Sequence, residues 1–140
     1  HQPITFSQWS HRDPRREGPF MSRDNSIHYT IQFDVADGKM SEFESLTDEA
    51  VATVESNEPG CVAYRWDING SSVRLHERFT DETAMVAHMS SSVATEIFPK
   101  LMAIAPVSRF DVHGDVSDES RAALEGFGGT IYGAWKGFNR

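Results

Sequence analysis

The stretch VAYRWDINGSSVRLHERF, residues 62–79, predicts a β-hairpin. Apolar and polar residues alternate along both halves, as they do in strands that bury one face. Between the halves, Asn69 and Gly70 are expected to supply the positive φ angles that a tight turn requires. The stretch therefore predicts two adjacent antiparallel strands. Their buried rows are expected to be Val62, Tyr64, Trp66 and Ile68 on the first strand and Val73, Leu75, Glu77 and Phe79 on the second.

The segments on either side complete the order β-α-β-β-α-β. A first strand is expected over residues 28–35, and helical spacing of apolar residues runs from Met40 until Pro59-Gly60 ends it. A second helix is expected over residues 82–105, interrupted near residues 90–92 and again near Pro99. A fourth strand is expected over residues 107–113. The buried row of the first strand is Tyr29, Ile31, Phe33 and Val35, and that of the fourth strand is Ser108, Phe110 and Val112. This order predicts an α+β, ferredoxin-like fold, in which two helices cover one face of a four-stranded antiparallel sheet.

The two ends of the chain differ from this central unit, which we expect to span residues 21–116. The length of 140 residues fits one domain. Residues 1–20 are expected to be a leader or an added extension before the true start; the alternative is an arm that docks onto a partner subunit. Residues 117–140 are expected to form a short helix that begins at Ser117 and an apolar tail that packs on the domain or its partner. The apolar residues of this tail are Ile131, Tyr132, Trp135 and Phe138.

Composition and charge narrow the classes of function. The chain has 13 Lys and Arg against 21 Asp and Glu, a net charge of −8, which opposes binding to nucleic acid and to anionic membranes. Its apolar runs are far shorter than the roughly 20 residues of a membrane span. Its one cysteine, Cys61, cannot form an internal disulfide, which suits a reducing compartment. We therefore expect a small, acidic, cytoplasmic protein.

Glu77 and His88 form the candidate site. Glu77 is the one carboxylate in a row of apolar residues, where an unpaired charge would be costly. His88 lies two turns into the second helix, on a stripe with Ala84 and Met85, so it can lie over the strand that carries Glu77. A carboxylate that fixes an imidazole tautomer makes a proton-handling pair near neutral pH. Two interpretations remain open: such a pair, or a histidine bonded to Glu77 only so that both can be buried.

Other kinds of site have little support in the sequence. The remaining histidines, at positions 1, 11, 28, 76 and 113, lack metal-ligand spacing, and no metal site is expected. Glycine-rich phosphate loops and nucleophile-elbow motifs are also missing from the sequence. Several aromatic residues are typical of a core and would also suit a flat aromatic ligand: Phe33, Trp66, Phe79, Phe98 and Phe110.

Three groups of residues resemble the antibiotic biosynthesis monooxygenase (ABM) family, which includes quinol monooxygenases and polyketide-tailoring oxygenases. They are Pro59-Gly60-Cys61, Tyr64-Arg65-Trp66 and the run ERFTDETAMVAH from Glu77 to His88, within a similarity that covers residues 27–113. The resemblance implies a homodimeric α/β barrel, in which two ferredoxin-like sheets pack together and each subunit keeps a pocket between its sheet and its helices.

The resemblance also implies a chemistry without cofactors. Family oxygenases deprotonate a phenol or anthrone, and the resulting anion passes an electron to O2 in a dry cavity. His88 is then the expected base, with Glu77 behind it, and the substrate is a small hydroxylated aromatic. The residues expected to line its pocket are Tyr64, Trp66, Phe79, Phe33, Met85, Phe98 and Phe110.

The sequence also departs from its relatives. Many continue the helix as H-x-x-T-P-H, where this chain has Ser91, Ser92 and Val93. Haem-degrading relatives carry a tryptophan at the position of His88 and a histidine near that of Phe98, so haem is not expected. The alternatives to a monooxygenase are a dimeric binding protein that shelters an aromatic ligand and a cyclase or isomerase that uses the Glu–His pair without O2.

The sheet face opposite the helices carries mostly polar residues, and periodicity alone predicts that it is exposed to solvent. A dimeric barrel instead requires that these charges pair across a subunit interface. The dimer is therefore expected from the resemblance and not from the pattern. The residues of this face are His28, Thr30, Gln32 and Asp34; Arg65 and Asp67; Arg74, His76 and Arg78; and Arg109, Asp111 and His113.

Overall fold

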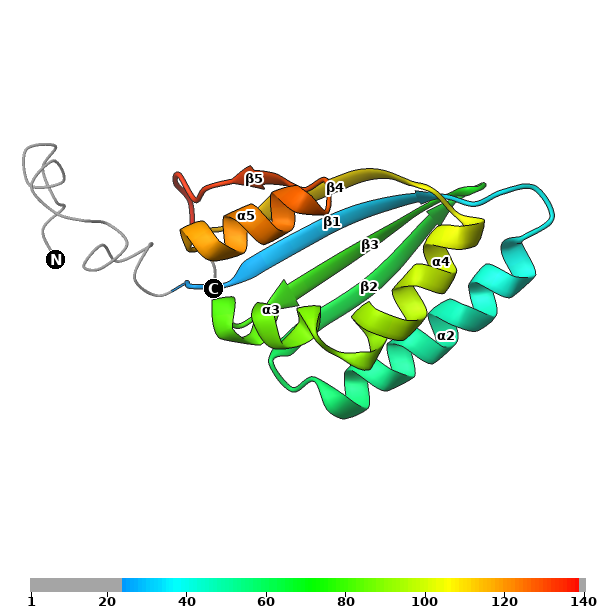
Figure 1. Ribbon diagram of the computed structural model, residues 1–140, viewed down its shortest axis with the longest axis horizontal. Helices are drawn as coiled ribbons and strands as arrows, with labels where there is room; N and C mark the ends of the chain where they lie inside the picture. Colours follow the sequence, from blue (N-terminus) through cyan, green and yellow to red (C-terminus); the bar gives the residue numbers. More distant parts are fainter. Residues whose placement is uncertain (1–23, 139–140) are drawn as a thin grey trace, which may run out of the picture.

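The computed structural model describes residues 24–138, and the elements follow one another as Figure 1 shows. They are β1 (Ile27–Asp34), α2 (Met40–Asn57), β2 (Cys61–Asn69), β3 (Ser72–Phe79), α3 (Glu82–Met89), the π-helix η1 (Val93–Ile97), α4 (Phe98–Ile104), β4 (Val107–His113), α5 (Asp118–Gly126) and β5 (Thr130–Tyr132). The N-terminal extension expected over residues 1–20 lies outside the described residues.

One sheet organises the molecule, with its strands in the order β2-β3-β1-β4-β5. The first four strands pair antiparallel, which confirms the predicted ferredoxin-like fold. The fifth was not predicted: β5 pairs in parallel with β4 at the edge of the sheet. In Figure 1, α2, α3 and α4 pack along the sheet, and α5 lies beside β4 and β5. The segment after β4 thus extends the sheet.

Two β-bulges shift the predicted buried rows. The β2–β3 register skips Val62, so Cys61 lies opposite Phe79 and the Val62 side chain is 55% exposed. The β1–β4 register skips Ser108, so Val107 lies opposite Phe33. A bulge inserts one residue and reverses the alternation beyond it. The predictions that Val62 and Ser108 belong to the buried rows are therefore wrong. The same holds for Ile68, which is 65% exposed beside the hairpin turn. In that turn Gly70 has a positive φ and Asn69, contrary to the prediction, does not.

The second predicted helix is three consecutive segments. The chain leaves the helix after α3, near the predicted break at residues 90–92, and then continues through η1 directly into α4. The predicted break at Pro99 does not occur, because Pro99 lies in the first turn of α4, where its missing N–H needs no partner. The chain therefore changes from π to α geometry where a second interruption was expected.

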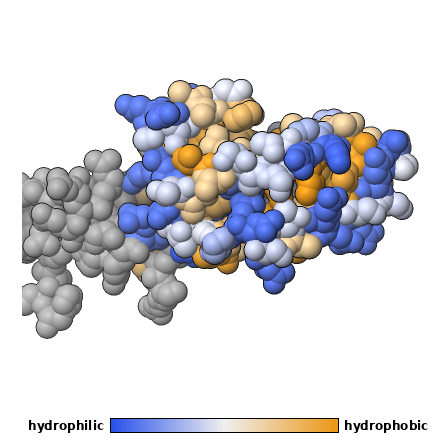
Figure 2. Space-filling view, turned by 60° about the horizontal axis from the view of Figure 1, so that its bottom comes forward, coloured by the Kyte–Doolittle hydropathy of each residue, from blue (hydrophilic) through white to orange (hydrophobic). Residues whose placement is uncertain are grey.

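The core lies between the sheet and the helices. Phe43, Ala50 and Val54 of α2 are buried against it, as is Leu124 of α5. The α5 helix begins where predicted, because the Ser117 side chain accepts a hydrogen bond from the backbone N–H of Ser120. No helix within residues 24–138 is long and apolar enough to cross a membrane. The helical surface seen in Figure 2 alternates between hydrophilic and hydrophobic patches.

The opposite face of the sheet is polar, and several of its charges pair within the chain. The guanidinium of Arg65 donates to Asp67 at 3.0 Å, that of Arg109 to Asp111 at 2.5 Å and that of Arg74 to Gln32 at 3.1 Å. Asp111 is buried, whereas the three arginines remain exposed. In the single chain this face therefore has the solvent-exposed character that periodicity predicts.

Candidate functional site

His88 lies between two carboxylates. Its Nδ1 is 2.6 Å from Oε1 of Glu58, and its Nε2 is 3.1 Å from Oε1 of Glu77. Only 8% of His88 and 3% of Glu77 are exposed. The structure thus brings the two predicted residues together beneath the helices and adds a third residue, Glu58, that sequence reasoning missed.

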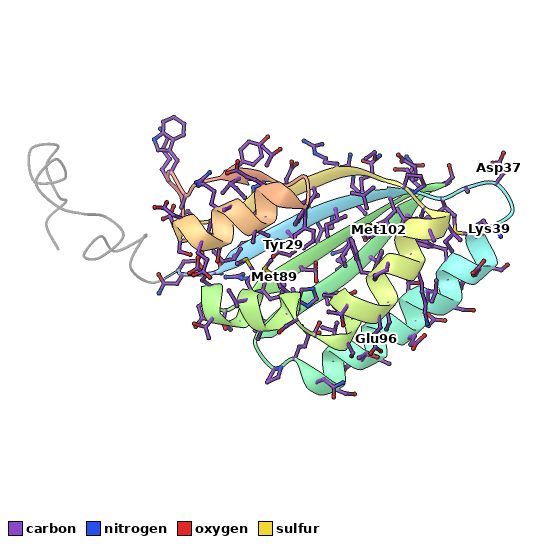
Figure 3. The ribbon with its side chains drawn as sticks, viewed as in Figure 1. Tyr29, Asp37, Lys39, Met89, Glu96 and Met102 are labelled. Carbon is purple, nitrogen blue, oxygen red and sulfur yellow. The ribbon has the colours of Figure 1, made fainter. Side chains whose placement is uncertain are left out.

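Strand β3 fixes the position of Glu77. Its Cα pairs with Tyr29 on β1 and with Tyr64 on β2, so a carboxylate lies between two tyrosines on three adjacent strands. The Tyr29 ring packs edge to face against Phe79 and Phe110, both at 5.1 Å. Figure 3 shows Tyr29 and Met89 between α5 and α3. This packing holds Glu77 in an apolar layer.

Helix α3 carries His88 in its last turn. The helix begins at Asp81, whose side chain accepts a hydrogen bond from the N–H of Ala84 at 2.9 Å. The ring of His88 lies 5.1 Å from that of Phe79. The cap at one end of the helix and the aromatic contact at the other therefore orient the imidazole toward the sheet.

The turn after α2 brings Glu58 to His88. Glu58 ends the helix, since its N–H donates to the carbonyl of Val54 at 2.9 Å, and its own carbonyl accepts from Cys61 at 3.0 Å. Gly60 makes this approach possible: a Cβ there would lie 2.5 Å from Cβ of Ala84. The Pro59-Gly60 turn can therefore lie directly against α3.

Burial changes the proton affinity of the groups around His88. Burial raises the pKa of Glu77 to about 7; His88 lowers it and Glu58 raises it further. Burial, and then the charge of Glu77, also raise the pKa of Tyr29 and of Tyr64. The pKa of Cys61 rises to about 12, chiefly by burial and then by the two carboxylates. Glu77 is therefore the carboxyl whose proton is exchangeable near neutral pH.

Four buried polar atoms near this layer have no hydrogen-bond partner among the described residues: Tyr29 Oη, Trp66 Nε1, Glu58 Oε2 and Glu77 Oε1. Glu77 Oε1 lies at ion-pair distance from His88 Nε2 but lacks hydrogen-bond geometry to it. Buried polar groups are normally satisfied, so unpaired ones are typical of sites that bind water or a ligand.

Three of the seven residues predicted to line a substrate pocket belong to the core, and the other four are partly buried and pack against it. Phe33, Phe79 and Met85 are 0% exposed. Phe33 packs within 5.6 Å of Phe43, Trp66 and Phe98, and Tyr64 lies 6.0 Å from Trp66. Phe110 contacts Tyr29 instead. Side chains thus fill the space between sheet and helices, and a ligand could enter it only by displacing some of them.

Three cavities open elsewhere on the described surface, and none is lined by the seven predicted pocket residues. One of about 390 Å³ is formed by residues 57–60 together with Ala84, Ala87, Ser91 and Ser92, so it borders Glu58. One of about 370 Å³ lies on the polar sheet face, and one of about 550 Å³ lies at the end of the sheet near His28 and Tyr132. Residues 24–138 contain no cluster of three or more His, Cys, Asp or Glu that could hold a metal ion.

Two residues of the site, Glu58 and Tyr29, were missed by sequence reasoning. Tyr29 could have been found, because it belongs to the predicted buried row and pairs directly with Glu77. Glu58 immediately precedes the Pro59-Gly60-Cys61 turn. Its contact with His88 crosses from the end of one helix to another, which residue spacing does not reveal.

Comparison with solved structures supports the fold. MupZ from Pseudomonas fluorescens is similar with a TM-score of 0.75 and 20% identity, over 84% of this chain and 96% of that chain. SnoaB from Streptomyces nogalater, a cofactor-independent oxygenase, is similar with a TM-score of 0.56 and 16% identity, over 67% of this chain and 94% of that chain. Rv0793 from Mycobacterium tuberculosis is similar with a TM-score of 0.58 and 18% identity, over 66% of this chain and 97% of that chain.

Comparison with protein families identifies the family, whereas the solved structures show only the fold. No curated protein matches the chain. The family described as antibiotic biosynthesis monooxygenase matches residues 26–100, which include β1, the hairpin, Glu58, Glu77 and His88. The chain belongs to the antibiotic biosynthesis monooxygenase family.

Proposed function

We propose that the protein is a cofactor-independent monooxygenase that oxidises a small hydroxylated aromatic, such as a quinol or an anthrone, with O2. The observation that carries the proposal is the buried His88–Glu77 pair, in which a carboxyl with a pKa near 7 lies 3.1 Å from an imidazole nitrogen. A base in an apolar layer can remove a phenolic proton and keep the anion away from water. Membership of the family supports this reaction class.

In the proposed reaction, His88 takes the proton of the substrate at Nε2, and Glu77 stabilises the imidazolium. The anion gives one electron to O2, and the two radicals combine to a peroxide anion, which takes the proton back from His88 and becomes a hydroperoxide. The O–O bond then breaks, the outer hydroxyl leaves as water with the hydrogen of the oxygen-bearing carbon, and a quinone carbonyl remains. The unpaired donors Tyr29 Oη and Trp66 Nε1 would bind the oxygen on which charge develops.

The substrate in this proposal lies among the predicted aromatic residues. Phe33, Phe79 and Met85 are fully buried, so binding requires that the partly exposed Tyr64, Trp66, Phe98 or Phe110 shift and open the layer. A methionine such as Met85 can repack around a flat ring because its side chain is unbranched. We further propose that the active unit spans residues 21–116 of a cytoplasmic homodimer, with residues 1–20 and 117–140 as additions to it.

The test is oxygen uptake by chelator-treated protein with hydroquinones, anthrones and catechols. We expect uptake above the autoxidation blank that falls at least tenfold in His88→Ala and is unchanged in Val86→Ala, a control on the exposed side of the same helix. Unchanged uptake in His88→Ala would remove His88 from the mechanism. If no compound causes oxygen uptake but one of them raises the melting temperature of the protein, a binding protein would be favoured.

The same geometry supports one other reaction class. A carboxyl with a pKa near 7 beside a histidine can both give and accept a proton at neutral pH, as a cyclase or isomerase requires. This reaction needs no oxidant. Conversion of a substrate that proceeds equally under nitrogen would support it and would contradict the monooxygenase.

A further inference from the structure

We propose that Glu58 is a positioning residue of the site: it holds the proton of His88 on Nδ1, and solvent reaches it through the cavity beside residues 57–60. The proposal deepens the proposed function, since it explains which imidazole nitrogen is the base. It begins from the shortest contact of the site, the 2.6 Å between Glu58 Oε1 and His88 Nδ1.

The two contacts of His88 differ in a way that fixes its tautomer. The Nδ1 contact is a short hydrogen bond to a carboxylate, whereas the Nε2 contact to Glu77 is longer, at 3.1 Å, and lacks hydrogen-bond geometry. A carboxylate oxygen accepts, so Nδ1 donates. In the neutral ring the lone pair then lies on Nε2. Glu58 therefore leaves Nε2 as the basic atom, directed toward the buried carboxyl.

The charge of Glu58 also acts on Glu77. Two carboxylates that share one imidazole disfavour ionisation of the more buried one, and Glu58 raises the pKa of Glu77. The other titratable groups around Glu58 and Glu77 are His88, Tyr29, Tyr64 and Cys61. The last three have raised pKa values, so they keep their protons near neutral pH. Removal of the Glu58 charge should accordingly lower the pKa of Glu77.

The side chain of Glu58 is more accessible than that of Glu77. Glu58 lines the cavity of about 390 Å³, together with Ala84 and Ala87 of α3 and with Ser91 and Ser92, and Glu77 borders the cavity of about 370 Å³ on the polar sheet face. The Glu58 side chain is 12% exposed, against 2% for that of Glu77. A small carboxylate from solution therefore reaches the position of the Glu58 side chain more readily than that of Glu77. This difference makes the role of Glu58 testable by chemical rescue.

The first experiment is ¹⁵N NMR of the histidine side chains, with His88 assigned from His88→Gln. In the unmodified protein we expect Nδ1 to be protonated and the lone pair to lie on Nε2. In Glu58→Gln, whose amide oxygen still accepts, we expect the same tautomer and a lower pKa of Glu77. In Glu58→Ala we expect loss of the Nδ1-protonated signal. Glu55→Ala, exposed on α2, is the matched control and should change neither.

The second experiment adds sodium formate to Glu58→Ala. Because formate fits the cavity, we expect it to restore the Nδ1-protonated signal and, where oxygen uptake has been established, most of the lost rate. The same addition to Glu77→Ala should restore nothing. Circular dichroism establishes that each variant is folded.

The outcomes separate this proposal from the proposed function. A tautomer in Glu58→Ala identical to that of the unmodified protein, or protonation of Nε2 rather than Nδ1 in the unmodified protein, would overturn the positioning role. Failure of formate to act on Glu58→Ala would overturn the route through the cavity. The NMR results need no substrate, so they stand even where no oxygen uptake is found, a result that would count against the monooxygenase alone.

Discussion

A single side chain, Glu77, links the stability of the protein to its chemistry. Burial gives it a pKa near 7, well above the roughly 4.3 of a carboxyl in an unfolded chain. The folded protein therefore binds a proton that the unfolded chain releases at lower pH. The free energy of unfolding then falls as pH rises from about 4.3 to about 7, because the folded state must keep the proton or bury a charge. A residue with this cost is expected at a functional site rather than in an optimised core.

The Glu77→Gln substitution measures this cost. Glutamine fills the same space but cannot ionise. Between pH 5 and pH 8, the free energy of unfolding should therefore fall less in the variant than in the unmodified protein. We expect the unmodified protein to lose on the order of 2–3 kcal/mol more than the variant over this range. Urea unfolding at pH 5 and pH 8 provides the comparison, and His88 and Glu58 are common to both proteins. Equal losses in both would show that Glu77 ionises with an ordinary pKa.

At the scale of the elements, hydrophobic periodicity predicts the helices and strands but not the irregularities between them. The alternation around Tyr64 and Trp66 yields the hairpin, and the place of Glu77 in an apolar row leads to His88. The bulges at Val62 and Ser108 escape prediction, because an inserted residue leaves the composition of a strand unchanged. The three-residue β5 is too short to show a period.

The contact between the α2 turn and α3 is a packing feature that can be tested directly. A Cβ on Gly60 would lie 2.5 Å from Cβ of Ala84 and 3.5 Å from its Cα. We expect Gly60→Ala to lower the free energy of unfolding by about 1–3 kcal/mol, the usual cost of overpacking, and to lengthen the Glu58–His88 contact. Gly126→Ala is the control: its Cβ would meet nothing within 4 Å at the end of α5, and we expect no loss of stability. Thermal unfolding of both variants tests this prediction. A Gly60→Ala variant as stable as Gly126→Ala would contradict the close packing of the turn against α3.

At the scale of the whole molecule, the helices cover one face of the sheet and leave the other uncovered. That face holds charges already paired within the chain, such as Arg65 with Asp67 and Arg109 with Asp111. Pairing of this kind satisfies several charges of the face and leaves the face polar. Such a surface can meet a second copy through hydrogen bonds and shared ion pairs, and an interface of this kind weakens as salt rises.

The proposed homodimer predicts a mass of about twice 15.7 kDa in sedimentation velocity at micromolar concentration. Thr30 lies on the central strand β1, opposite His76 on β3 and Asp111 on β4. We expect Thr30→Arg to give monomers, because the long cation would crowd the centre of the interface. Glu96→Arg, on the helical layer in Figure 3, makes a larger change of charge away from the sheet and should leave the dimer intact. A monomer in the unmodified protein would rule out the barrel; a dimer unaffected by Thr30→Arg would place the interface on another surface.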